Sequence, residues 1–189
     1  MALSERFRGR SVADTLAERA AEAPRHPFVV LGERRLTYGQ VDAQATALAA
    51  ALYELGIEAG DRIALNLPNW PEFVVSMFAA AKLGATIVPL NPKYTASELQ
   101  YMLRHSESVV VVTAENWEGV DYLARFEGFL ASLPDLQYVL SVGEEDGEAD
   151  GEDAGPQVRV GLEEAVRRPG GRLRVQGRRG AKLPVGVTA

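Results

Sequence analysis

The chain has 189 residues, of which 47% are apolar and 24% are charged, which is the composition of one folded domain and excludes a disordered chain. Its formal net charge of −6 argues against nucleic acid as a partner, and the lack of cysteine excludes disulfides and thiolate metal sites. No apolar stretch reaches the roughly 20 residues of a membrane span, and none follows the arginines after Met1 as in a signal peptide, so we expect a cytoplasmic protein.

The first expected elements are a helix and a hairpin. Ser11 is a suitable N-cap, and Pro24 stops the helix. The apolar face of this helix consists of Val12, Leu16, Ala20 and Ala23. Two β-rich runs, at 28–31 and 35–38, flank a turn that contains Gly32, and this pattern predicts a β-hairpin.

A longer helix is expected to follow the hairpin. Thr37 and Gln40 have the spacing of a capping box, and Gly56 supplies the stop. The apolar face between them consists of Val41, Ala45, Leu48, Leu52 and Leu55. A short apolar run at 62–67 then predicts a strand.

The next helix and strand repeat this order. We expect Asn69 to cap a helix that has Pro71 in its first turn and ends at Gly84. Its predicted buried face consists of Phe73, Val74, Met77, Phe78 and Ala81. Residues 85–90 predict a strand, in which Pro89 requires an edge or an end because proline donates no ladder hydrogen bond.

Strand and helix patterns continue to residue 142. Thr95 and Glu98 form a second capping-box pair, followed by an apolar face at Leu99, Met102 and Leu103. Strands are expected at 108–113 and 138–142, with a helix at 116–132 between them. This alternation predicts an α/β fold in which helices cover both faces of a layered, mostly parallel sheet. The side chains expected in the buried sheet are Ile63, Leu65, Ile87, Val88, Val110 and Val112.

Six short stretches carry a family resemblance. They are Leu-Thr-Tyr-Gly-Gln at 36–40, Gly-Asp-Arg-Ile-Ala at 60–64, Leu-Pro-Asn-Trp-Pro-Glu-Phe at 67–73, Ala-Lys-Leu-Gly-Ala at 81–85, Val-Pro-Leu-Asn-Pro at 88–92 and Glu-Leu-Gln-Tyr-Met-Leu at 98–103. In this order they resemble the amino-terminal region of the adenylate-forming enzymes, the AMP-dependent synthetases and ligases, over roughly residues 11–143. The stretches at 69–73 and 91–95 are more similar to the acyl-CoA synthetases than to the peptide synthetases.

The resemblance implies a two-step reaction that uses ATP, Mg²⁺ and coenzyme A in the complete enzyme. A carboxylic acid would first form an acyl-adenylate and pyrophosphate, and coenzyme A would then displace AMP. The family's phosphate loop, its Tyr-Gly-x-Thr-Glu segment, its ribose-binding aspartate and its late lysine have no match in this chain. Residues 172–182, where the phosphate loop is due, lack its serine and threonine run and do not have Walker spacing. We therefore assign no catalytic, cofactor-binding or metal-binding residue and expect an inactive fragment.

A few single residues have two interpretations. Trp70 and Tyr94 follow strands and would either line a cleft or pack a loop against the sheet. Lys82 and His105 lie late in helices, where a cation complements the helix dipole, and the alternative for Lys82 is a catalytic role. Gly84, like Gly56, is interpreted as a helix stop.

Residues 1–143 are expected to form one α/β unit. The rest of the chain divides by composition into three segments. Residues 144–157 are acidic, with seven carboxylates at 144–153, and form either a surface loop or a calcium loop that lacks EF-hand spacing. Residues 158–168 predict a short strand or helix. The tail at 169–189 is expected to be unstructured; residues 167–189 hold seven basic and no acidic residues. This basic run would be either an anion-binding arm or the product of a shifted reading frame.

Three functions remain open at this point. The first is the fragment of an acyl-CoA synthetase described above. The second is a non-catalytic α/β module that associates with a separate polypeptide carrying the adenylation residues. The third is an unrelated doubly wound domain that binds a small ligand, although no glycine fingerprint follows any strand. An open sheet edge would favour self-association or a missing partner.

Overall fold

The computed structural model describes residues 9–143 and 174–177. Its elements, in chain order, are α2 (Val12–Glu22), β1 (Pro27–Leu31), β2 (Arg34–Thr37), α3 (Tyr38–Glu54), β3 (Arg62–Asn66), α4 (Pro71–Leu83), β4 (Thr86–Pro89), α5 (Ala96–His105), β5 (Val110–Ala114), β6 (Asn116–Trp117), β7 (Val120–Asp121), α6 (Tyr122–Glu127), a 3₁₀ turn (Leu130–Ser132), β8 (Tyr138–Val142) and β9 (Arg174–Gly177). Five of the strands form one sheet in the order β4-β3-β5-β8-β9. Strands β4, β3, β5 and β8 run parallel to one another, and β9 is antiparallel to β8.

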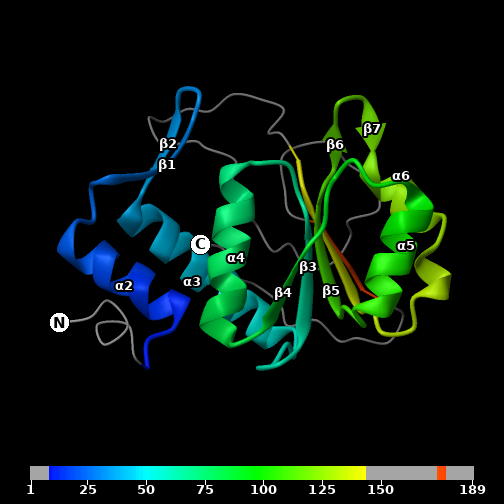
Figure 1. Ribbon diagram of the computed structural model, residues 1–189, viewed down its shortest axis with the longest axis horizontal. Helices are drawn as coiled ribbons and strands as arrows, with labels where there is room; N and C mark the ends of the chain where they lie inside the picture. Colours follow the sequence, from blue (N-terminus) through cyan, green and yellow to red (C-terminus); the bar gives the residue numbers. More distant parts are fainter. Residues whose placement is uncertain (1–8, 144–173, 178–189) are drawn as a thin grey trace.

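The helices cover both faces of this sheet. Figure 1 shows α2, α3 and α4 on one side and α5 and α6 on the other. The β1–β2 hairpin is a separate two-stranded sheet beside α4. The predicted α/β class, with a mostly parallel sheet between helices, is confirmed.

Local sequence signals determine where the helices begin. The predicted capping box at α3 is present, with the Thr37 hydroxyl accepting from the Gln40 N–H at 3.3 Å and the Gln40 side chain accepting from the Thr37 N–H at 2.9 Å. The capping box that begins α5 at Thr95 is also present, and α2 begins at Ser11 as predicted. Gly84 ends α4 with a φ of 73°, a left-handed conformation that favours glycine.

The core is centred on the three middle strands of the sheet. Leu65 pairs with Val112 and Val112 pairs with Leu140, and none of these side chains is more than 1% exposed. The Tyr138 hydroxyl donates a 3.1 Å hydrogen bond to the Leu55 carbonyl, which ties β8 to the end of α3. These contacts join the sheet and the α3 side into one body.

Strand β4 forms one edge of the sheet, as the proline in it requires. The prediction for Pro89 is therefore confirmed. The prediction that Ile87 and Val88 are buried is only partly correct, since both are half-buried. An edge strand has a neighbour on one side only, so its side chains receive less cover than those of β3 and β5.

The prediction of one helix at 116–132 is wrong. The segment instead forms the β6–β7 hairpin, then α6 and the 3₁₀ turn. Glu118 and Gly119 have φ values of 48° and 76°, and these left-handed conformations make the hairpin turn. Asp121 then caps α6 by accepting from the Ala124 N–H at 2.9 Å. The periodic apolar residues that suggested a helix are shared among these shorter elements.

The start and the buried side of α4 also differ from the prediction. Trp70, not Asn69, is the N-cap, and it makes no side-chain capping bond. The residue before a proline avoids helical conformation, so the helix begins at Pro71. Of the predicted buried face only Phe78 is buried. The half-buried members are Phe73, Val74, Met77 and Ala81.

Part of the expected unstructured tail forms a strand. Residues 174–177 pair with β8 as β9, because the backbone groups of a sheet edge bind another strand without any side-chain pattern. The other residues of 144–189, including the acidic segment at 144–157, the segment at 158–168 and the rest of the tail, lie outside the described residues.

Candidate functional site

The carboxyl ends of the parallel strands meet at one edge of the sheet. Open α/β sheets bind ligands at this edge. The residues that the structure places there are Asn66 at the end of β3, Asn91 and Tyr94 after β4, Thr113 and Glu115 at the end of β5, and Ser141 and Gly143 at the end of β8. This edge is therefore the candidate site.

A row of three polar side chains crosses the sheet at this edge. Asn66 pairs with Thr113 and Thr113 pairs with Ser141, so the three side chains share one face, and each is 0% exposed. The Asn66 Nδ2 donates a 3.3 Å hydrogen bond to the Thr113 hydroxyl. The Asn66 Oδ1 and the Ser141 Oγ have no partner among the described residues. Buried polar atoms without a partner are unusual, which makes this row the most notable polar feature of the sheet.

Sequence reasoning missed this row. Its signal is a polar residue at or near the end of an apolar strand, in Leu65-Asn66, Val112-Thr113 and Leu140-Ser141. The alignment of the three positions depends on strand order and register, which one sequence does not contain. The row offers an amide and two hydroxyls but no base, so it can hydrogen-bond a group and has no activated nucleophile.

The loops beyond β5 and β8 lie close to one another. The Glu115 N–H donates to the Val142 carbonyl at 2.8 Å, and a Cβ placed on Gly143 would lie 2.5 Å from the Glu115 Oε2. A side chain at Gly143 would therefore have to displace the carboxylate. Nearby, the buried Tyr122 hydroxyl donates to the Pro92 carbonyl at 2.9 Å, and burial raises the pKa of this phenol.

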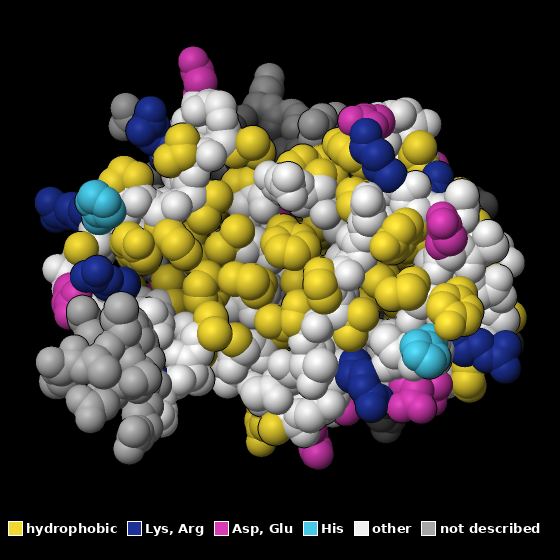
Figure 2. All heavy atoms as spheres, in the orientation of Figure 1, with side chains coloured by type: hydrophobic (Ala, Val, Ile, Leu, Met, Phe, Trp, Pro, Cys, Tyr) yellow, Lys and Arg dark blue, Asp and Glu magenta, His cyan; other side chains and the backbone are white. Residues whose placement is uncertain are grey.

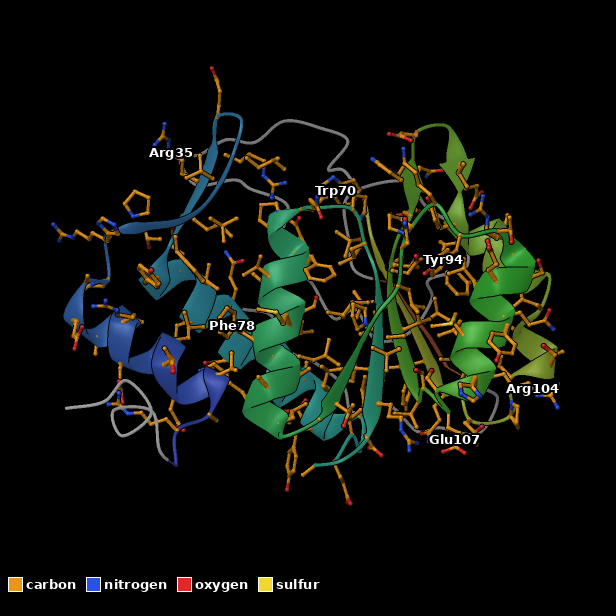
Figure 3. The ribbon with its side chains drawn as sticks, viewed as in Figure 1. Arg35, Trp70, Phe78, Tyr94, Arg104 and Glu107 are labelled. Carbon is orange, nitrogen blue, oxygen red and sulfur yellow. The ribbon has the colours of Figure 1, made fainter. Side chains whose placement is uncertain are left out.

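The structure does not bring Trp70 and Tyr94 together. Trp70 lies at the beginning of α4, and Tyr94 lies beside α5 (Figure 3). Both are half-buried and pack against the core. Of the two interpretations given above, this contact agrees with a loop that packs against the sheet. Tyr94 also borders an open hollow of about 320 Å³ on the outer side of α5, together with Ser97, Glu98, Tyr101 and Met102.

The other single residues have structural roles. The Lys82 Nζ lies 2.8 Å from the Asp42 Oδ1 and joins α4 to α3. The His105 ring stacks on Tyr101 with 5.6 Å between centroids. Gly84, with the conformation given above, ends a helix as predicted.

An ion pair in which only the carboxylate is buried was not predicted. Glu72, in the first turn of α4, has a side chain that is only 3% exposed, and its Oε1 lies 2.5 Å from Nη2 of Arg34 in β2. The helix dipole also favours a carboxylate at this position. An acid after an N-terminal proline is readable from the sequence, but its partner lies 38 residues earlier and emerges only from the fold.

The described residues contain no cluster of side chains that could hold a metal ion. Among residues 9–143 and 174–177, no group of three or more histidines and carboxylates could hold a metal ion. No glycine- and serine-rich loop follows a strand in that part of the chain. No helix there combines the length and the apolar character needed to cross a membrane.

Known proteins match most of this chain. The model of the AMP-binding enzyme family matches residues 16–169. The chain is 40% identical over 138 residues to the long-chain-fatty-acid–CoA ligase FadD13 of Mycobacterium tuberculosis, covering 61% of this chain and 27% of that protein. It is 31% identical over 136 residues to the 2,3-dihydroxybenzoate-AMP ligase of Bacillus subtilis, covering 72% and 25%.

A solved structure has the same fold. The N-terminal domain of FACL13 from Mycobacterium tuberculosis, solved with a bound inhibitor, matches with a TM-score of 0.62 and 32% identity. The match covers 70% of this chain and 33% of that domain. The chain spans about a quarter of the length of the curated relatives it matches.

Proposed function

The chain belongs to the AMP-binding enzyme family, and we propose that it is the amino-terminal part of an ATP-dependent, AMP-forming acyl-CoA synthetase that is inactive by itself. The family match confirms the resemblance found in the sequence. The observation that carries the finer proposal is the 40% identity to a fatty-acid–CoA ligase, which is higher than the 31% identity to the aryl-acid ligase.

The proposed parent reaction needs groups that the described residues do not provide. Attack of a carboxylate on the α-phosphate of ATP develops negative charge, which cationic side chains, backbone N–H groups and Mg²⁺ offset in phosphoryl-group chemistry. Neither the ion pairs described above nor the buried polar row fits such a site. ATP, Mg²⁺, coenzyme A and the carboxylic acid would bind in the complete enzyme, and we derive no catalytic step from the described residues.

We also propose the bounds of the domain and its following segments, and the cellular compartment of the protein. Residues 1–143 would be one subdomain, followed by an acidic loop at 144–157, a short strand or helix at 158–168 and a basic tail at 169–189. The protein would be cytoplasmic. The half-buried apolar side of α4 supports a subdomain that is completed by further polypeptide.

Pyrophosphate exchange tests the proposal. The purified 189-residue chain should give no acid-dependent ATP–pyrophosphate exchange with acetate, hexanoate, palmitate or benzoate. A chimera in which residues 11–143 replace the matched segment of FadD13 should exchange with a fatty acid and not with benzoate. Exchange by the 189-residue chain alone would refute inactivity, and a folded chimera without exchange would refute the synthetase assignment.

A further inference from the structure

One loop of the candidate site is held by a distant part of the chain. Residues 91–95 connect β4 to α5 at the carboxyl edge of the sheet. Within this loop, Asn91 accepts a 2.9 Å hydrogen bond from the Lys93 N–H at its Oδ1 and a 3.0 Å bond from the Tyr94 N–H at its carbonyl. Local bonds of this kind shape a turn, and the orientation of the turn on the sheet depends on contacts with other elements.

Two side chains of α6 bind the backbone of this loop. The Tyr122 hydroxyl donates to the Pro92 carbonyl at 2.9 Å. The Arg125 Nη1 donates to the Tyr94 carbonyl at 3.0 Å. Residues three apart lie on the same face of a helix, so one turn of α6 holds two carbonyls of the loop. The Arg125 guanidinium also lies 5.0 Å from the centre of the Tyr122 ring, a cation–π contact that couples the two donors.

Burial makes the first of these bonds hard to replace. Tyr122 is only 1% exposed, and a buried phenol needs a hydrogen-bond partner because water does not reach it. The carbonyls of a surface loop, by contrast, can be satisfied by water. The bond therefore exchanges water for α6 at the Pro92 carbonyl. A turn that only connected β4 to α5 would not require such an anchor.

A second set of contacts at this loop is weaker. The Lys93 Nζ lies 5.6 Å from the centre of the Trp117 ring and 3.6 Å from the Glu118 Oε2, both in the β6–β7 hairpin. The Lys93 and Glu118 side chains are 68% and 59% exposed, and exposed ion pairs contribute little. Figure 2 shows basic and acidic side chains together at the surface where Figure 1 places this hairpin. Among the described contacts, those with α6 therefore hold the loop most firmly.

We propose that Tyr122 and Arg125 are positioning residues, which hold the 91–95 loop in the geometry that a ligand at the carboxyl edge of the sheet requires. The inference rests on the proposed function, in which the complete enzyme binds ATP, coenzyme A and a carboxylic acid. Neither side chain touches the ligand, because each acts through a carbonyl of the loop. A loop that is already ordered spares the ligand the entropic cost of ordering it, so the contribution of α6 is to affinity.

Hydrogen exchange in the 189-residue chain tests whether α6 holds the loop. In Tyr122→Phe the ring remains and only the hydroxyl is lost. The amides of Lys93 and Tyr94 should then exchange roughly tenfold faster, while the amide of Val112, in the centre of the sheet, changes less than about twofold. Arg125→Met should give the same pattern. Unchanged exchange at residues 93 and 94 in both variants would overturn the proposal, and so would equal acceleration at Val112, which indicates general destabilisation.

Tyr138 supplies a matched control at the amino end of the parallel strands. It is also buried, at 5% exposed, and its hydroxyl also donates to a backbone carbonyl, that of Leu55 at 3.1 Å. Tyr138→Phe therefore removes the same chemical group from a comparable environment. It should leave the exchange of the Lys93 and Tyr94 amides within about twofold of the unsubstituted chain. Acceleration there equal to that in Tyr122→Phe would refute a specific role for Tyr122.

Kinetics separates positioning from a general effect on stability. The enzyme is the chimera described above, in which residues 11–143 replace the matched segment of FadD13, and the assay is thioester formation with palmitate. Tyr122→Phe should raise the KM of at least one of ATP, palmitate and coenzyme A roughly fivefold and change kcat less than about twofold, because looser binding weakens ground state and transition state alike. Tyr138→Phe should change neither constant by more than about twofold.

The two assays separate failure of this inference from failure of the proposed function. Unchanged KM values for all three substrates in an active Tyr122→Phe chimera would refute a positioning role, and so would a fall in kcat with unchanged KM. A folded chimera without activity would refute the proposed function. The exchange result on the 189-residue chain does not depend on activity, so it would still decide whether α6 holds the loop.

Discussion

The ion pair between Arg34 and Glu72 makes a quantitative prediction about stability. Arg34→Met would leave the Glu72 carboxylate, 3% exposed, without its cation. Loss of one partner from a fully buried pair costs about 3–5 kcal/mol, and an exposed pair contributes about 0–1 kcal/mol. Because the Arg34 side chain is 35% exposed, water can partly replace it, and we expect a loss of about 2 kcal/mol. At about 2–4 °C per kcal/mol this lowers the melting temperature by roughly 4–8 °C.

The assay is urea unfolding of the 189-residue chain, followed by circular dichroism. Arg34→Met, Glu72→Met and the double variant complete a thermodynamic cycle. The double variant should be more stable than Arg34→Met, because it no longer buries an unpaired charge. Arg62→Met is the matched control: its partner Glu107 also lies far away in sequence, but the two side chains are 45% and 62% exposed, and the expected loss is below about 1 kcal/mol. Strictly additive effects of the two substitutions would refute the coupling.

Three further predictions concern the core, a cap and a helix end. Leu65→Ala, in the 0%-exposed centre of the sheet, should lower the free energy of unfolding by about 3 kcal/mol in the same assay, and a loss below about 1 kcal/mol would contradict the buried position. The backbone and hydroxyl hydrogen bonds from Thr95 lower the pKa of Glu98, so the cap stabilises the fold at neutral pH and loses this effect as the pH falls through the lowered pKa. Thr95→Ala should raise the pKa of Glu98 measured by NMR titration of its carboxyl group. An unchanged pKa of Glu98 would contradict the cap. Gly84→Ala should cost about 1–2 kcal/mol on unfolding, since the φ of 73° is left-handed and the new Cβ would lie 3.3 Å from the Ala59 Cβ; a neutral effect would contradict this conformation.

Sequence patterns predicted the elements whose signals are local. The capping pairs at Thr37 and Thr95 are read within four residues, and both are present. The edge position of Pro89 follows from its missing N–H alone. The helix expected at 116–132 failed because its apolar spacing did not reveal the left-handed turn at Glu118 and Gly119.

The candidate site was less predictable, because its geometry depends on residues far apart in the chain. Asn66 and Thr113 are 47 positions apart, and they meet because β3 and β5 are parallel neighbours. Trp70 and Tyr94, which the sequence singled out, each follow a strand, yet they end on different elements of the fold. A polar residue at the end of an apolar strand is therefore a more useful signal here than an aromatic one in the following loop.

The difference at α4 has another cause. Periodicity predicted that Phe73, Met77 and Ala81 face a core, and in the structure they are half-buried while the smaller Ala79 and Ala80 are 0% exposed. Large apolar side chains on the open side of a helix are unfavourable in water, at about 25 cal/mol for each Å² left exposed. The pattern becomes consistent if the helix is selected for contacts on both sides, one with α3 and the sheet and one with polypeptide outside the described residues. A mismatch between apolar periodicity and observed burial thus indicates that the described residues do not include every neighbour of the helix.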